Sequence, residues 1–260
     1  MLDLYDTHAH LDADAFSKDL EEVLSRAESA GVRRILTIGI NLETSRSAVA
    51  LAEQYEQVSA VIGIQPNYAA EAGPTDLAEI EALLKHPQVV GIGETGLDRY
   101  WDFAPIDVQI EYFRAHLRLA FESDLPFIIH CRDAEADVIE VLKEFEDHQP
   151  FRGVMHSFCG SRESAEICLG MGLHLSFSGM LTYKKNQELR EVARSVALDR
   201  LLIETDAPYL VPTPKRGKVK RNEPAFVEYT ARVLAEVHGL SVEDMAAQTA
   251  RNARDLFGTN

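Results

Sequence analysis

Short runs of apolar, often β-branched residues alternate along the chain with longer stretches in which apolar residues recur at helical spacing. Most of the short runs, such as residues 35–40 and 127–129, lack the polar alternation of a half-exposed strand. Strands buried on both faces have this composition, which favours a parallel sheet covered by helices. The runs predict strands at Leu2–Leu11, Arg33–Asn41, Val58–Pro66, Val89–Asp98, Pro126–Arg132, Gly153–Phe158, Leu173–Gly179 and Arg200–Ala207.

Amphipathic segments fill the intervals between these strands, and several have recognisable ends. Ser17 is predicted to cap a helix over Asp19–Ala30, with Gly31 just past its end. Thr44 is predicted to start the helix that runs through Gln54. Further helices are predicted at Leu77–Leu84, at Asp107–Ser123, at Glu163–Met171 after a Ser161 cap, and after Ser241, which forms a capping-box pattern with Asp244.

Eight strands that alternate with helices predict the α/β class and a TIM-like (β/α)8 barrel. Such a barrel typically needs about 250 residues, and no linker-like segment interrupts the chain, so one domain over residues 1–260 is predicted. A doubly wound open sheet is the alternative. The strand count favours closure, because eight strands suit a barrel filled by side chains.

Composition narrows the function classes. The chain has 26 Lys and Arg against 42 Asp and Glu, a net charge of −16, which argues against general coating of nucleic acid but not against local capture by a basic patch or a bound metal. Three cysteines are too few for a disulfide scaffold. No secretion signal and no apolar run of ~18–20 residues is found. We therefore expect a cytoplasmic protein with no membrane partner and no obligate protein partner.

Ionisable residues stand where five of the predicted strands end, and this is the edge at which a barrel carries its active site. They are four imidazoles and two carboxylates: His8, His10, Glu94, His130, His156 and Asp206. A single interior histidine is more often a hydrogen-bonded core group than a ligand. Six such groups in one dry barrel mouth would be very costly without a cation, so the set predicts a metal site.

Six ligands are too many for one tetrahedral ion, whereas two ions ~3.5–4 Å apart can accommodate them. Glu94 is the predicted bridge, with His8, His10 and Asp206 on one ion and His130 and His156 on the other. Zn, Mg or Mn would suit these ligands. Glu94 and Asp206 are the predicted catalytic residues, and Asp206 could instead serve mainly as a base or orienting group for the attacking water.

Longer stretches around these residues carry a family resemblance. The chain resembles a TatD-family metal-dependent hydrolase, a deoxyribonuclease-type branch of the amidohydrolase superfamily. The matching stretches are residues 6–11 (DTHAHL), 91–98 (GIGETGLD), 129–134 (IHCRDA), 203–210 (IETDAPYL) and 222–227 (NEPAFV). The resemblance implies a TIM-like barrel, a divalent-metal centre with the same six ligands and hydrolysis of DNA phosphodiesters. In many members it implies 3′→5′ exonuclease action on single strands.

Two departures from the family pattern concern the substrate. The family often has a His-Pro-His type run where this chain has Gln65-Pro66-Asn67. Gln65 and Asn67 could hydrogen-bond a phosphate oxygen, but an amide cannot protonate a leaving group. The loop at 216–223 is longer than the compact family form, which leaves the placement of its cations open.

That loop belongs to a basic run with five cations in residues 215–221. Lys218, Lys220 and Arg221 are predicted to contact substrate phosphates, the alternative being a solvated loop of no special use. Arg132 would likewise meet a phosphate, or else form an ion pair with Asp133 or Asp137.

The remaining assignments concern stacking and support. Tyr100 and Trp101 are predicted to stack a base, or else to serve as a hydrophobic anchor of their loop. Glu204 and Asp6 are predicted to orient ligand imidazoles, or else to be buried partners of a base. The other histidines lie on predicted helices or loops and are interpreted as ordinary: His86, His116, His148, His174 and His238.

Three functions follow. The first is a divalent-metal-dependent deoxyribonuclease that cleaves DNA with metal-activated water. The second is an amidohydrolase-type enzyme for a small ester, lactone or cyclic amide, and the basic run favours the first over it. The third is a non-catalytic barrel, against which the intact ligand set argues.

Overall fold

The computed structural model describes residues 2–259. Its strands follow one another in chain order across one sheet, and every recorded strand pairing is parallel. The strands are β1 (Leu4–Ala9), β2 (Val32–Ile38), β3 (Val58–Ile62), β4 (Val89–Asp98), β5 (Phe127–Arg132), β6 (Gly153–Met155), β7 (His174–Phe177) and β8 (Leu201–Ile203).

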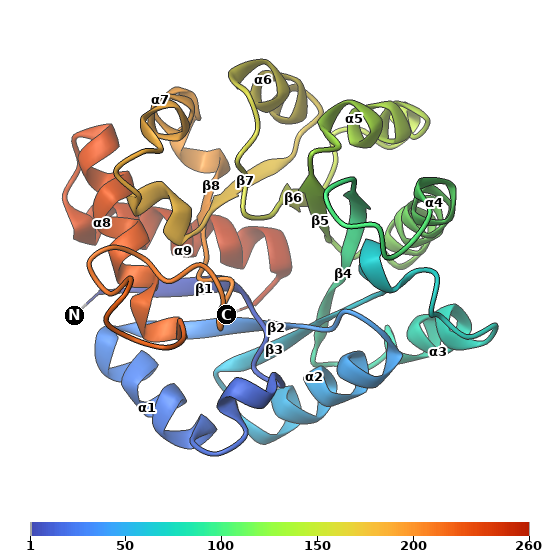
Figure 1. Cartoon of the computed structure of the whole chain (residues 1–260), viewed down its shortest axis with the longest axis horizontal. Helices are drawn as coiled ribbons and strands as arrows, with labels where there is room; N and C mark the ends of the chain where they lie inside the picture. The colour runs from blue at the N-terminus through green and yellow to red at the C-terminus, as the bar shows by residue number, and fades with distance from the viewer. Residues whose placement is uncertain (1, 260) are drawn as a thin grey trace. The chain divides into compact units, whose positions relative to one another are not determined.

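A helix follows each strand, as the colour sequence in Figure 1 shows. This alternation and strand order confirm the predicted α/β class and (β/α)8 barrel topology. The α-helices are α1 (Leu20–Ala30), α2 (Leu42–Gln54), α3 (Asp76–Leu83), α4 (Ile106–Ser123), α5 (Glu135–Lys143), α6 (Arg162–Gly170), α7 (Gln187–Ser195), α8 (Val227–His238) and α9 (Val242–Phe257). Among the described residues, no helix is long and apolar enough to cross a membrane.

Two compact units make up the described residues. The terminal unit comprises the described parts of Met1–Thr37, Ser157–Ala165 and Leu175–Asn260, and the central unit comprises Ile38–His156 and Glu166–His174. The central unit contains the consecutive pairs β3–β4, β4–β5 and β5–β6. That the whole chain forms one domain stays a prediction.

In the terminal unit, the first and the last strand of the sheet lie next to each other. In it β7 pairs with β8, β1 pairs with β2, and Ala207, just past β8, forms a parallel bridge with Ala9. Adjacency of the last strand to the first distinguishes a barrel from a doubly wound sheet, which leaves its edge strands unpaired.

Apolar side chains build a core in each unit. In the central unit α4 packs on β4 with Phe113 and Leu117 fully buried, and in the terminal unit α9 packs on β1 with Met245 fully buried. Full burial of each such side chain contributes ~1.5–3 kcal/mol. These helix–strand contacts hold the strand ends that carry the candidate site residues.

Strands β6 and β8 end earlier than predicted, at Met155 and Ile203. Ser157 and Asp206 have φ values of 44° and 56°, in the left-handed region, and such a residue cannot continue an extended strand. His156 and Asp206 therefore lie in the loops just after the strands. The prediction of longer strands was wrong because these turns are not visible as Gly or Pro.

The helix ends partly match the prediction. Ser17 is not the cap of α1, because its hydroxyl donates to the Asp14 carbonyl and Asp19 occupies the N-cap position. The second helix begins at Leu42, and Thr44 completes a capping box with Asn41 instead of starting it.

The other predicted ends hold. Gly31 ends α1 at φ 94°, where a Cβ would lie 2.6 Å from the Leu2 carbonyl oxygen. Ser161 and Ser241 accept hydrogen bonds from the backbone N–H groups of Ser164 and Asp244, as expected of caps.

His116, which the sequence places on a helix away from the candidate site, is a fully buried core histidine. Its Nδ1 lies 2.7 Å from the Tyr112 carbonyl oxygen, and its Nε2 accepts a hydrogen bond of 2.9 Å from the Ile64 N–H. Nε2 must therefore be unprotonated. Burial lowers the pKa of His116 from 6.5 to about 4, against a smaller opposing effect of the Tyr112 carbonyl.

This pKa predicts a loss of stability in mild acid. The unfolded chain takes up a proton at His116 near pH 6.5 and the folded chain only near pH 4, so the contribution is complete above pH 6.5 and declines as the pH falls toward 4. Between pH 7.5 and pH 5 we expect the wild type to lose about 2 kcal/mol more unfolding free energy than His116→Gln. Urea denaturation of both proteins at the two pH values measures this, and parallel pH profiles would contradict it.

Candidate metal centre

His8, His10 and Asp206 form one group of ligand atoms in the terminal unit. One nitrogen of each ring and one carboxylate oxygen all lie within 4.8 Å of one another. Nε2 of His8 and Nε2 of His10 lie 3.8 and 3.5 Å from Oδ1 of Asp206. His8 is fully buried, and His10 and Asp206 are largely so. The structure thus brings these three predicted ligands together.

Backbone hydrogen bonds position Asp206 in this group. Its N–H donates to the His8 carbonyl at 2.8 Å, and the His10 N–H donates to the Ala207 carbonyl at 2.8 Å. The loop after β8 is thereby tied to the end of β1 on both sides of Asp206. The left-handed backbone of Asp206, which Asp tolerates better than most residues, turns the loop at this point.

Asp6 supports this join. Its carboxylate accepts hydrogen bonds from the backbone and hydroxyl of Thr205, at 2.8 and 2.5 Å, and from the His8 N–H at 3.3 Å. Burial raises the pKa of Asp6 to about 8 despite these bonds, and the nearby Glu204 adds to the rise. The hydrogen bonds of Asp6 thus go to Thr205 and to the backbone of His8, and its role in orienting a ligand imidazole stays a prediction. Glu204 is fully buried, and its predicted role stays untested.

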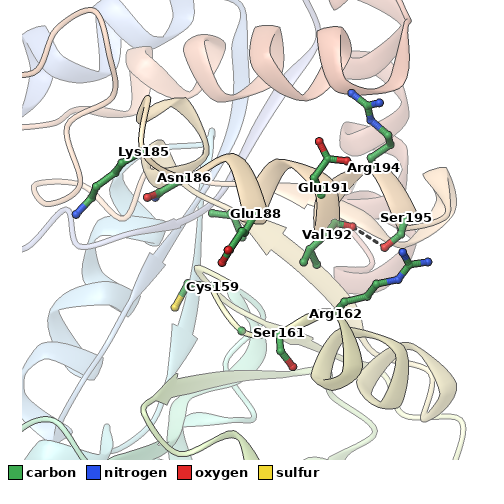
Figure 2. Close-up of a pocket in the computed structure, with 12 residues that line it drawn as sticks. Cys159, Ser161, Arg162, Lys185, Asn186, Glu188, Glu191, Val192, Arg194 and Ser195 are labelled. Atoms are coloured by element: carbon green, nitrogen blue, oxygen red, sulfur yellow. Dashed lines mark hydrogen bonds between the residues drawn. The ribbon is translucent and has the colours of Figure 1, made fainter.

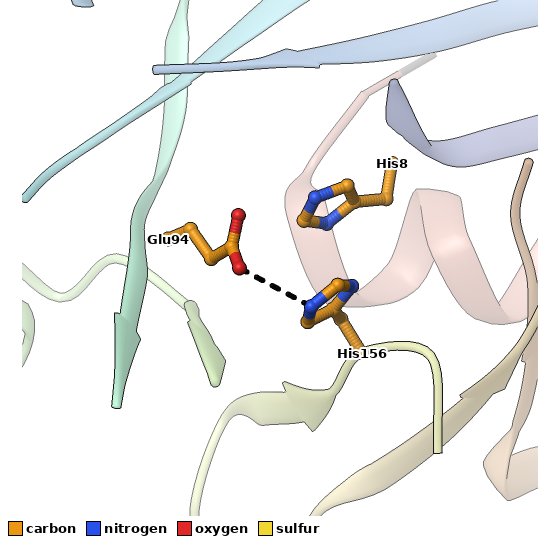
Figure 3. A group of neighbouring side chains, drawn as sticks. All are labelled: His8, Glu94 and His156. Atoms are coloured by element: carbon orange, nitrogen blue, oxygen red, sulfur yellow. Dashed lines mark ion pairs between the residues drawn. The ribbon is translucent and has the colours of Figure 1, made fainter. Parts of the chain in front are cut away.

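Glu94, His130 and His156 form the second group, in the central unit. Oε1 of Glu94 lies 2.7 Å from Nδ1 of His130 and 3.3 Å from Nε2 of His156. Figure 3 shows the His156 ring facing the Glu94 carboxylate. The two imidazole nitrogens are themselves 3.4 Å apart, so three ligand atoms converge on one point.

Asp98 is the residue of this group that the sequence reasoning missed. Its Oδ2 lies 2.9 Å from Nε2 of His130 and accepts a bond of 3.1 Å from the Asn67 amide, while Oδ1 accepts from the N–H groups of Tyr100 and Trp101. Burial raises the pKa of Asp98, but the bonds from His130, the Trp101 N–H and Asn67 outweigh it and lower the value to about 2. The available signal was its spacing of four from Glu94 on one buried strand, which places both on the same face.

Gly96, between the two acids, allows the strands to approach. It has φ 130°, and a Cβ there would lie 2.1 Å from the His130 carbonyl oxygen. Only glycine tolerates both the angle and the contact. This close approach brings β5, and with it His130, up to the two carboxylates.

The second group fits a divalent cation. Because Asp98 holds the proton on Nε2, a neutral His130 directs its Nδ1 lone pair at the Glu94 carboxylate. That arrangement is unfavourable unless a second proton or a cation intervenes. Burial lowers the pKa of His130, but its bonds to Asp98 and Glu94 raise it above the ordinary value. Imidazole and carboxylate ligands suit Zn and Mn.

The amides of Gln65 and Asn67 are engaged with the protein. Oε1 of Gln65 accepts from the Asn67 N–H at 2.8 Å and caps a short 3-10 turn at Pro66–Tyr68. Asn67 donates to Asp98 and thus supports His130 indirectly. Their predicted contact with phosphate stays untested.

Arg132 does not form the ion pair with Asp137 that was the alternative to its predicted phosphate contact. Asp137 instead accepts two hydrogen bonds of 2.7 Å from Arg99. The Arg132 guanidinium lies over the Tyr100 ring, 3.7 Å from its centroid. Tyr100 and Trp101 are 54% and 45% exposed, and their predicted stacking on a base stays a prediction.

The basic run divides into cations held by the protein and cations in solvent. Arg221 forms an ion pair with Asp19, donates to the Ala15 carbonyl and covers the Phe16 ring. The Arg221 guanidinium is therefore engaged with the fold, and its predicted contact with phosphate stays a prediction. Lys215 and Arg216 lie over the rings of Phe226 and Tyr183. Lys218 and Lys220 are exposed, as a phosphate contact would require.

A cavity of about 760 Å³ lies in the terminal unit along α7 (Figure 2). Its walls come from residues 159–162 and from residues between Lys185 and Ser195. None of the predicted site residues lines it. The candidate centre is therefore identified by its ligand chemistry and not by this cavity.

Asp98→Asn is expected to weaken metal binding about 10- to 100-fold, because the amide no longer fixes the proton and orientation of His130. Asp137→Asn is the matched control, since it removes a carboxylate that pairs with Arg99 on the protein surface. Competition with a chromogenic chelator measures Zn affinity for both variants. Equal affinity of Asp98→Asn and wild type would contradict the support role of Asp98.

Comparisons with known proteins agree with this chemistry. The family model of TatD related DNases matches residues 5–258. The chain is 46% identical over 257 residues, 99% of this chain and 100% of the relative, to the uncharacterized metal-dependent hydrolase YabD of Bacillus subtilis. It is 38% identical over 259 residues, 98% of this chain and all of the relative, to the 3′-5′ ssDNA/RNA exonuclease TatD of Erwinia amylovora. The crystal structure of YJJV, a TatD homolog from Escherichia coli, superposes with a TM-score of 0.92 at 31% identity, covering 99% of this chain and 98% of that one. The chain therefore belongs to the TatD family of metal-dependent hydrolases.

Proposed function

We propose that this protein is a divalent-metal-dependent nuclease that hydrolyses phosphodiester bonds of DNA. The observation that carries the proposal is that imidazole and carboxylate ligands come together within each unit: His8, His10 and Asp206 from β1 and the loop after β8, and Glu94, His130 and His156 from β4, β5 and the loop after β6. Fold similarity alone would not support it, because barrels host many chemistries.

The two groups of ligands are proposed to act as one centre. In a (β/α)8 barrel the C-terminal ends of all strands lie on the same face, which is where active sites occur. The six ligands would then be His8, His10 and Asp206 for one ion, His130 and His156 for the other, and Glu94 shared by both. Two divalent ions, of Zn, Mg or Mn, would supply an activated water and polarise a phosphoryl oxygen.

Side chains of the protein would position the attacking water and orient the metal ligands. The Asp206 carboxylate would hold the attacking water and accept its proton, as its position beside His8 and His10 allows. Asp98 would keep the His130 ring oriented through Nε2. Gln65 and Asn67 offer no titratable proton, so the leaving oxygen would take its proton from water.

The choice of nucleic acid rests on two supports. One relative is named a 3′-5′ ssDNA/RNA exonuclease, which favours 3′→5′ action on single strands here. Lys218 and Lys220 place exposed positive charge in the loop after β8 of an otherwise acidic chain. A cytoplasmic location stays a prediction.

Glu94→Ala and Asp206→Asn are each expected to abolish hydrolysis, at least 100-fold, while the thermal unfolding midpoint stays within a few degrees of wild type. Digestion of end-labelled single-stranded DNA with Mg, Mn or Zn, with and without chelator, measures the activity. Glu140→Gln, an exposed carboxylate on α5, is the control and should retain full activity. Near-normal turnover of metal-replete Glu94→Ala would refute the shared centre. Cleavage of lactones or cyclic amides in place of DNA would establish a different hydrolase.

The basic loop gives an independent prediction. Replacing Lys218 and Lys220 by Ala should weaken binding of single-stranded DNA and reduce the slope of log K against log salt by ~1.4, since each phosphate contact on a single strand contributes ~0.7. The same double change at Lys85 and Lys143, which are exposed at the opposite ends of α3 and α5 from the strand-to-helix loops, controls for net charge. Fluorescence anisotropy between 50 and 300 mM salt gives both slopes. If both double variants keep the wild-type slope, the loop does not contact phosphate.

A further inference from the structure

Three aromatic side chains stand exposed on the loop between β4 and α4. Tyr100 is 54%, Trp101 45% and Phe103 61% exposed. The Trp101 and Phe103 rings stack, with centroids 5.4 Å apart and planes at 21°, and Tyr100 meets Trp101 edge to face. Large exposed apolar groups gathered in this way mark interaction sites on proteins.

Buried polar contacts hold this loop at both of its ends. Gln109, which is 1% exposed, clamps both ends of it: its side chain donates to the carbonyls of Asp98 and Ala104 and accepts from the Asp98 N–H. Oδ1 of Asp98 further accepts from the N–H groups of Tyr100 and Trp101. The loop backbone is thus held by buried polar contacts, and a large part of each ring faces solvent, where a ligand can reach it.

The same carboxylate ties the loop to the candidate centre. Asp98 binds the first two residues of the aromatic run through Oδ1 and His130 through Oδ2. The backbone at Tyr100 and Trp101 is therefore joined to the His130 ring by one carboxylate, within a single unit of the fold. Arg132, two residues after His130 on β5, lies over the Tyr100 ring, so a ligand on the rings would lie beside the strand that carries His130.

Arg132 adds a positive charge to this surface. Its guanidinium lies 3.7 Å from the Tyr100 centroid and 5.7 Å from the Trp101 centroid. Flat rings for stacking beside a cation for phosphate are the combination with which proteins hold unpaired strands. In a duplex, neighbouring base pairs cover the faces of the bases. Aromatic side chains could therefore stack only on the terminal base pairs.

We propose that Tyr100, Trp101 and Phe103 form a stacking platform for unpaired bases of the substrate, with Arg132 toward the strand's phosphates, and that this platform selects single strands over duplex. The inference rests on the proposed nuclease function and assigns strand selectivity to the β4–α4 loop. Phe103, which no sequence motif marks, is a specificity-determining residue in it.

The chain contains one tryptophan, so intrinsic tryptophan emission reports on Trp101 alone. The test uses the full-length metal-loaded protein titrated with a phosphorothioate oligothymidylate, which resists cleavage. We expect saturable quenching of the emission by the single strand, and much weaker quenching by the same strand annealed to its complement.

Phe103→Ala retains the reporter and is expected to raise the Kd for the single strand about 10-fold, through loss of one stacking ring. Trp101→Leu should do the same when the Kd is read by anisotropy of a labelled strand. Leu240→Ala, another exposed apolar residue, between α8 and α9, is the matched control and should leave the Kd unchanged. Circular dichroism of each variant establishes that it is folded.

Several results would overturn the platform: no quenching, the same Kd in Phe103→Ala as in wild type, or equal affinity for strand and duplex. Self-association of the wild type that Phe103→Ala abolishes, without quenching by the oligonucleotide, would assign the rings to a second copy of the chain. Hydrolysis of an ordinary labelled strand is measured separately. Hydrolysis without quenching leaves the nuclease function standing and removes the platform, whereas quenching without hydrolysis does the reverse.

Discussion

The hydrogen bond between Asp98 and His130 is the interaction on which the candidate centre most depends. It fixes which nitrogen of His130 carries the proton and so directs the other toward Glu94. Without it the ring could rotate or take the other tautomer, and the convergence of Glu94, His130 and His156 would be lost. Asp98 can serve this purpose because hydrogen bonds hold its pKa at about 2, so it stays ionised when buried.

The terminal unit reaches a similar result by a different construction. There, backbone hydrogen bonds join the loop after β8 to the end of β1 around Asp206. The Asp6 carboxylate adds to this join, because it accepts hydrogen bonds from Thr205 and from the His8 N–H. The central group is thus ordered by a side-chain hydrogen bond and the terminal group by backbone pairing. In each unit, the carboxylate and imidazole ligands of that group lie close enough together to bind one cation.

The cations near the candidate ligands differ in whether they contact the protein or the solvent. Of the cations after β8, Arg221 is used for an ion pair with Asp19 and Arg216 lies over a ring, while Lys218 and Lys220 remain in solvent. Arg132 likewise lies on Tyr100 and not in an ion pair with Asp137. The guanidinium suits these stacked positions because it is planar and weakly hydrated; Lys215 of the same run also lies over a ring, that of Phe226.

The sequence by itself determined the (β/α)8 topology and the ligand types. Buried parallel strands have continuous apolar runs, so ionisable residues that interrupt the later part of such a run, such as His8, Glu94 and His130, can be recognised from the sequence alone. Only the tertiary structure decided which polar side chains support them. The partners of Asp98, Asp6 and Arg221 come from segments distant along the chain, and hydrogen bonds between such segments leave no periodic trace in the sequence. The left-handed turns at Ser157 and Asp206 were also hidden, because these residues adopt that backbone only when the surrounding hydrogen bonds impose it.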